Sequence, residues 1–157
     1  MLPIVMADLS TVNTTAPMGR LLVVGLGLIG GSLALAARQR HLFSEVIGTS
    51  RSPATLQKAM ELGVVDRVES NLSTALAAME AGDIVVVGVP TLTVPNIIAQ
   101  LKEHLAPEVS FTDVASVKGS IVASVRDIYG AVPTQFVPGH PIAGSEKSGV
   151  AECLETV

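Results

Sequence analysis

Short runs of β-branched and other apolar residues alternate along this chain with segments of helical composition. The strongest run is "DIVVVGVP" at 83–90, and "RLLVVGL" at 20–26 has the same character. Helical stretches of about 10–13 residues follow such runs, which is the pattern of βαβ units. Because crossovers between parallel strands are right-handed, we expect an α/β fold: a doubly wound parallel sheet with helices on both faces.

The expected helix boundaries carry their own signals. Ser52 and Pro53 are typical of a helix start, and Gly63 of its end, while Asn71 or Ser73 starts the next helix. The expected strands span 20–26, 45–50, 83–90, 109–115 and 134–140, and the expected helices span 28–40, 52–63, 71–82, 93–105 and 118–130.

Composition excludes several classes of protein. An apolar content of 48% and a mean hydropathy of +0.54 suit a sheet that is buried on both faces. Aromatic residues make up only 3% and the net charge is -4, so we expect no nucleic-acid partner. No run reaches the roughly 18 apolar residues of a membrane span. The single cysteine, Cys153, has no internal disulfide partner, which favours the cytoplasm.

The length of 157 residues suits one domain, which we place at 20–157. The opening residues 1–19 are polar in their second half and have the pattern of neither a signal peptide nor a transit peptide. We therefore expect a flexible tail there.

The stretch "VVGLGLIGGS" carries a glycine motif between the first strand and the first helix. Gly25 permits a tight turn, Gly27 lets the backbone approach a pyrophosphate, and Gly30 lets helix and strand pack closely. The helix N-terminus adds free N–H groups and partial positive charge. The motif, with Leu28 and Ile29 inside it, predicts a Rossmann-type dinucleotide-binding domain; a tight turn without a ligand is the alternative.

The end of the second strand bears on the choice of cofactor. An acid is expected there for the ribose 2′-OH of NAD, but this chain has Thr49, Ser50 and Arg51, and Glu45 stands at the wrong end of the strand. Hydroxyls and a guanidinium bind a 2′-phosphate, which an acid would repel. We therefore predict NADP, with NAD as the second choice.

Ligands of an open parallel sheet bind beyond the carboxyl ends of its strands. Three more such ends are "VGVPT" at 87–91, "TDVASVKGS" at 112–120 and "VPGHPIAGSEKSG" at 137–149. The last combines glycines and prolines with His, Glu and Lys, which a purely structural loop has little need of. We expect the chemistry there.

The motifs "GLGLIGGS", "TDVASVKG" and "GHPIAGSEKSG" resemble the NADP- or NAD-binding half of prephenate dehydrogenase, over about residues 20 to 150. This family includes the arogenate and cyclohexadienyl dehydrogenases of tyrosine biosynthesis. The resemblance implies a small-molecule substrate, prephenate or arogenate, and an oxidative decarboxylation. Hydride leaves the ring carbon that bears the hydroxyl, and the ring carboxylate departs as CO₂.

The resemblance also implies roles for individual residues, and no metal site. His140 takes the hydroxyl proton, and Ser116 bonds His140 or the substrate hydroxyl near the nicotinamide. Ser145 contacts the substrate, while Lys118 either helps with its charge or caps the following helix. The loop after the third expected strand lines the path of the cofactor with Val89, Pro90 and Thr91.

In the family this half continues into a helical domain that supplies dimer contacts and an arginine for the substrate carboxylates. This sequence ends at Val157, and its last arginine is Arg126. We therefore expect a chain that binds NADP but is incomplete as an enzyme by itself, and a homodimer only where the helical domain is present. A catalytically silent NADP-binding module is the alternative.

Overall fold

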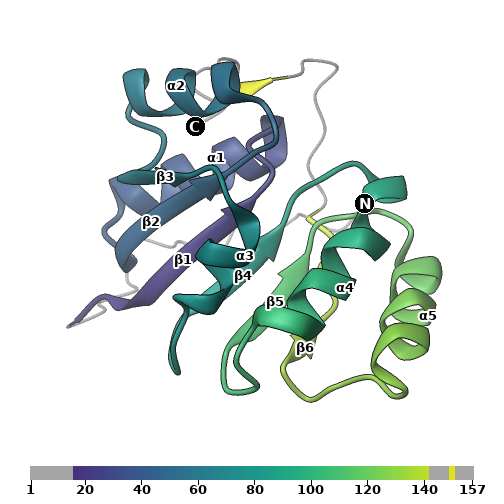
Figure 1. The fold of residues 1–157 in the computed structure, drawn as a ribbon. Helices are drawn as coiled ribbons and strands as arrows, with labels where there is room; N and C mark the ends of the chain where they lie inside the picture. Colours follow the sequence, from purple (N-terminus) through teal and green to yellow (C-terminus); the bar gives the residue numbers. More distant parts are fainter. Residues whose placement is uncertain (1–15, 142–148, 151–157) are drawn as a thin grey trace, which may run out of the picture.

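The computed structural model describes residues 16–141 and 149–150, which build one parallel sheet with helices packed against it (Figure 1). The strands are β1 (Met18–Val24), β2 (Phe43–Thr49), β3 (Arg67–Glu69), β4 (Ile84–Val87), β5 (Ser110–Asp113) and β6 (Phe136–Val137). The helices are α1 (Leu28–Gln39), α2 (Pro53–Glu61), α3 (Leu72–Ala77), α4 (Val94–His104) and α5 (Lys118–Tyr129), with a short 3₁₀ turn η2 (Thr91–Thr93).

The strand order is β3-β2-β1-β4-β5-β6, and every neighbouring pair is parallel. This is the Rossmann order, so the predicted doubly wound α/β fold is confirmed. The chain winds outward from β1 to β3, then returns to the other side of β1 with β4. The carboxyl ends of β1 and β4 therefore flank the point where the direction reverses, which is where such sheets bind ligands.

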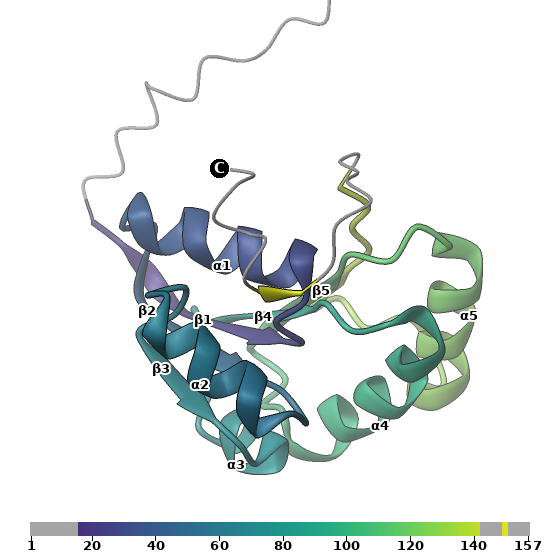
Figure 2. The same ribbon diagram turned by 90° about the horizontal axis from the view of Figure 1, so that it is seen from above.

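Both faces of the sheet are covered, which explains the uninterrupted apolar runs of the central strands. Along β1, Leu21 and Val23 pack with α1 and α2, whereas Leu22 and Val24 face α3 and α4. Figure 2 shows α1 on one side of the sheet and α4 and α5 on the other.

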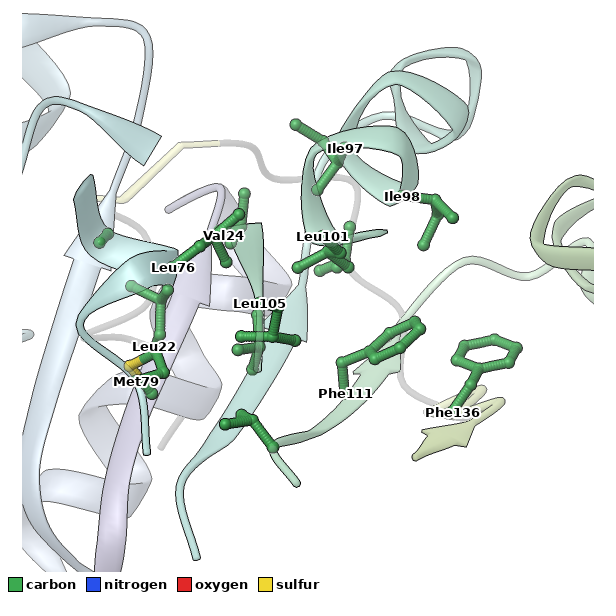
Figure 3. Packing of buried hydrophobic residues seen from close by; sticks show 14 of the residues in the cluster. Leu22, Val24, Leu76, Met79, Ile97, Ile98, Leu101, Leu105, Phe111 and Phe136 are labelled. Atoms are coloured by element: carbon green, nitrogen blue, oxygen red, sulfur yellow. The ribbon is translucent and has the colours of Figure 1, made fainter. Parts of the chain in front are cut away.

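The larger core cluster lies beneath α4 and α5 (Figure 3). Helix α4 buries Ile97, Ile98 and Leu101, whose spacing of one, three and four residues places them on one face of a helix. The rings of Phe111 and Phe136 stack with centroids 5.0 Å apart, which joins the short edge strand β6 to the core.

Helix starts follow the signals in the sequence. The Ser52 hydroxyl accepts a hydrogen bond from the Thr55 N–H at 3.3 Å, which makes Ser52 the N-cap of α2. Asn71 caps α3 in the same way, by accepting from the Thr74 N–H at 3.1 Å. Of the two candidates, Asn71 rather than Ser73 therefore starts α3.

The observed elements differ from the sequence-based expectation at several points, and three of these differences have a clear cause. β3 was not expected, because three residues with one apolar side chain, Val68, leave no alternation to recognise. β1 begins at Met18, two residues before the expected domain boundary, and the Met18 N–H donates to the Leu42 carbonyl. α3 ends at Ala77 rather than at 82, because the chain turns there into β4.

That turn is built around Asp83, which is 5% exposed. Its carboxylate accepts hydrogen bonds from the N–H groups of Arg20 and Glu80 and from the Arg20 guanidinium, at 2.6–3.0 Å. Burial raises the pKa of Asp83, but these bonds lower it by more, so the pKa lies below the usual value of 3.8. The pair fastens the amino ends of β1 and β4 together.

Candidate dinucleotide-binding and active site

The glycine motif forms a tight crossing between β1, β4 and α1. Gly25 has φ +97°, and its N–H donates to the Thr49 carbonyl at 2.9 Å. A Cβ on Gly25 would lie 2.7 Å from the Gly88 carbonyl oxygen, and one on Gly30 would overlap the Gly25 carbonyl. Only glycine fits at these two positions, because backbone lies where a side chain would begin.

Gly27 differs from its two partners in the motif. It is exposed, and a Cβ built on it would meet nothing within 4 Å. It is also the N-cap residue of α1, and no side chain caps this helix. The N–H groups of the first turn of α1 are therefore left to a ligand, at the end of the helix that attracts anions.

A cleft of about 350 Å³ opens beside this loop, at the point where the winding of the sheet reverses. Among the predicted cofactor residues it is lined by Gly25, Gly27, Ser50, Arg51, Val89 and Pro90. Leu28, Ile29, Gly30, Thr91 and Ser116 do not line it. Gly30 is buried beneath the loop, while Leu28 and Ile29 lie in the first turn of α1.

The charge of the cleft is one-sided. Among the described lining residues Arg51 is the only ionised side chain, and none is an acid. The Ser50 hydroxyl accepts the Ser52 N–H at 3.2 Å, and the Ser52 hydroxyl accepts the Thr55 N–H. Because each hydroxyl spends a lone pair on the backbone and keeps its O–H, both can donate to a ligand that only accepts.

Sequence reasoning missed several lining residues. Thr55 lies in the first turn of α2, and Ser70 follows β3, so both reach the cleft through elements beside Ser50. The capping pattern at 52–55 could have pointed to Thr55 as a lining residue. The position of Ser70 could not be predicted, because it follows β3, a strand without a recognisable sequence pattern. Gly88 and Val150 also line the cleft.

A second group of side chains lies at the carboxyl end of β5. The Asp113 side chain is fully buried, and one of its oxygens, Oδ2, accepts the Ala115 N–H at 3.0 Å and pairs with the Lys118 ammonium. Ser116 stands between these two residues and is exposed. Lys118 begins α5 bound to Asp113, and 27% of its side chain is open to solvent.

His140 reaches the same end of the sheet from β6. Gly139 packs so closely on β5 that a Cβ there would lie 2.6 Å from the Asp113 carbonyl oxygen and 2.8 Å from the Thr112 hydroxyl. His140 follows directly and is exposed. Within the described residues no hydrogen bond joins Ser116 to His140, and Ser145 lies outside those residues.

The described part of the chain lacks two further kinds of feature. No three His, Cys, Asp or Glu side chains gather there as a metal site would require. No helix between residues 16 and 141 has the length and apolar character needed to cross a bilayer.

Comparison with known proteins decides the family. The family model of the prephenate dehydrogenase nucleotide-binding domain matches residues 33–157. The chain belongs to the prephenate dehydrogenase family. The match to the family model begins within α1, and it therefore includes the side chains at the carboxyl ends of β5 and β6.

Individual relatives of the prephenate dehydrogenase family agree in sequence and in fold. A prephenate dehydrogenase of Bacillus subtilis is 36% identical over 86% of this chain. The crystal structure of a prephenate dehydrogenase from A. aeolicus, in complex with hydroxyphenyl propionate and NAD+, superposes with a TM-score of 0.76 at 33% identity, over 87% of this chain and 46% of that one. Synechocystis arogenate dehydrogenase gives a TM-score of 0.72 at 36% identity, over 84% and 44%.

These relatives are longer than the chain described here. The chain spans 36% of the length of the prephenate dehydrogenases from Lactococcus lactis and Bacillus subtilis. The similarity therefore establishes the nucleotide-binding domain of the family, and the activity of the longer proteins is a separate question.

Proposed function

We propose that this chain is the cofactor-binding domain of an NADP-dependent dehydrogenase that oxidatively decarboxylates prephenate or arogenate. The observation that carries the proposal is the cleft at the reversal point. It lies beside a glycine loop in which Gly25 and Gly30 leave no room for a side chain. Among the described residues that line it, Arg51 has the only charged side chain.

The lining favours NADP over NAD. A ribose 2′-OH needs an acceptor as well as a donor, and no described lining residue is an acid that would serve. A 2′-phosphate needs donors only. The Arg51 guanidinium and the free O–H groups of Ser50 and Ser52 are such donors, and the uncapped α1 N-terminus suits the pyrophosphate.

When bound, a nicotinamide dinucleotide would supply the hydride acceptor. His140 takes the proton of the substrate hydroxyl as hydride leaves the ring carbon and a C=O bond forms. The electrons of the breaking C–CO₂ bond then complete the aromatic ring and move the C=O electrons onto oxygen, which takes the proton back. Imidazole is the side chain most often used as a general base, and that of His140 is exposed to solvent, where a substrate can reach it. Ser116, at the adjacent strand end, orients the hydroxyl or His140, and Ser145 contacts the substrate.

Lys118 contributes positive charge for an anionic substrate. An ammonium has three N–H donors, and the contact with Asp113 leaves others free. It lacks the planar fork with which arginine grips a carboxylate through two hydrogen bonds. We therefore expect the 157-residue chain to bind NADP and to turn over prephenate poorly.

The test is a pair of measurements on the same preparation. Calorimetric titration should show tighter binding of NADP than of NAD, and steady-state assays should compare prephenate with arogenate at saturating NADP. Equal affinity for the two cofactors would refute the NADP assignment. Turnover of neither substrate, even after a helical domain from a relative is fused to the chain, would favour a silent NADP-binding module.

A further inference from the structure

The carboxylate of Asp113 is the most deeply buried charged group at the candidate active site. The residue is 1% exposed and its side chain fully buried. Its Oδ2 atom serves both the Ala115 N–H and the Lys118 ammonium, while no donor in the described part of the chain reaches Oδ1. A buried carboxylate oxygen without a donor is costly, so its retention beside a site calls for an explanation.

The contacts of Asp113 surround the two candidate catalytic groups. Its carboxylate binds the residues on both sides of Ser116, namely Ala115 directly before it and Lys118 two positions after it. Its main-chain oxygen lies against Gly139, the residue before His140. The Asp113 side chain therefore fixes the Ser116 loop at two points, and its main chain packs against the segment that carries His140.

From this arrangement we propose that Asp113 is a positioning residue, whose carboxylate holds the Ser116 loop in register with the neighbouring Gly139–His140 segment, so that the nicotinamide end of the site is formed before the ligand binds. The proposal rests on the proposed function for the placement of the nicotinamide near Ser116. Asp113 acts in this role without touching the cofactor or the substrate.

The chain offers a matched control at the opposite end of the sheet. Asp83 is also a buried aspartate with a basic partner and backbone donors, but it lies at the amino ends of β1 and β4. If Asp113 served stability alone, Asp113→Asn and Asp83→Asn would behave alike. If it positions the site, only Asp113→Asn should affect the ligand.

Two ligands distinguish the nicotinamide end of the site from its adenosine end. The test is to measure the Kd of NADP and of 2′,5′-ADP, which has the adenosine half only, by calorimetry on the full chain. Asp113→Asn should leave 2′,5′-ADP binding within about twofold and weaken NADP about three- to tenfold, the worth of one hydrogen bond. Asp83→Asn should change neither, and amide NMR shifts should move at Ala115–Lys118 only in Asp113→Asn.

A second variant guards against a simple loss of folding. Asp113→Asn combined with Lys118→Met removes the ammonium that would otherwise be left unpaired. It should regain melting temperature over Asp113→Asn alone while the weaker NADP binding persists. Equal effects on both ligands, unchanged NADP binding, or failure of both variants to fold would overturn the proposal. If the parent chain binds neither ligand, the proposed function fails, and the NMR comparison still decides whether Asp113 orders the Ser116 loop.

Discussion

At the scale of single residues, the proposed choice of NADP rests on one cation in a cleft that has no described acid. Arg51 is exposed and lines this cleft beside Ser50. Arg51→Ala should cost NADP about 1.5–3 kcal/mol of binding free energy, the worth of a hydrogen bond to a charged group. NAD, which lacks the 2′-phosphate, should lose little.

Calorimetric titration of both cofactors checks this prediction. Arg126→Ala is the control, because Arg126 is an exposed arginine on α5 and its loss changes the net charge equally. A similar loss of NADP affinity in the control would mean that overall charge, and not a contact, governs binding.

His140 is the second residue with a specific consequence. Its exposure at the end of β6 suits a group that meets substrate rather than the core. In a form of the protein that turns over prephenate or arogenate, His140→Asn should lower kcat about 10²–10⁴-fold, the usual contribution of general base catalysis. NADP affinity should stay the same. Turnover within a few-fold of the parent would remove His140 from the mechanism.

At the scale of elements, we expect one glycine of the loop to matter for cofactor binding and another to matter for stability. Gly27 has φ -77° and open space around it, so Gly27→Ala should leave the melting temperature almost unchanged. The added methyl would stand where a pyrophosphate must approach, so NADP should bind less tightly. Gly30→Ala should instead destabilise the protein, by about 1–3 kcal/mol, because its methyl would overlap the Gly25 carbonyl.

Thermal unfolding and cofactor titration of both variants provide the test. Gly27→Ala should weaken cofactor binding at nearly constant stability, whereas Gly30→Ala should lower the stability first. Two variants with the same loss of stability would contradict the distinction between the open and the closed glycine.

The elements that the sequence predicted are those with local signals. Ser52 and Asn71 caps, the positive φ of Gly25 and the apolar runs of β1 and β4 all follow from a few neighbouring residues. β3 escaped because its pairing with β2, not its own three residues, makes it a strand. The contact between Asp113 and Gly139 escaped for the same reason, since Gly139 comes from the segment that follows another strand, β6.

At the scale of the whole molecule, the Arg20–Asp83 pair makes stability depend on pH. The pKa of Asp83 is lowered in the folded state, so its contribution is complete above the unfolded value of about 4 and is lost as the pH falls through the lower folded value. Asp83→Asn should cost about 2–3 kcal/mol at pH 7. The difference from the parent should shrink toward pH 3.

Denaturant unfolding at pH 7 and pH 3 measures this difference. Asp127→Asn, which removes an exposed carboxylate of α5, should show neither the cost nor the pH dependence. A parent–variant difference that is constant with pH would show that Asp83 acts by packing and not through its charge.

The central position of β1 also bears on the order in which the molecule assembles. Within each half of the sheet, β1–β3 and β4–β6, short helical connections join the neighbouring strands. β1 pairs with β4 only when residues far apart in sequence come together, such as Arg20 and Asp83, which are 63 positions apart. Closing so long a loop costs more chain entropy than either half requires, and non-local pairing slows folding. In pulsed hydrogen exchange we expect the amides of the β1–β4 ladder to become protected last, so that the seam along which the ligand cleft opens is the final part of the sheet to form.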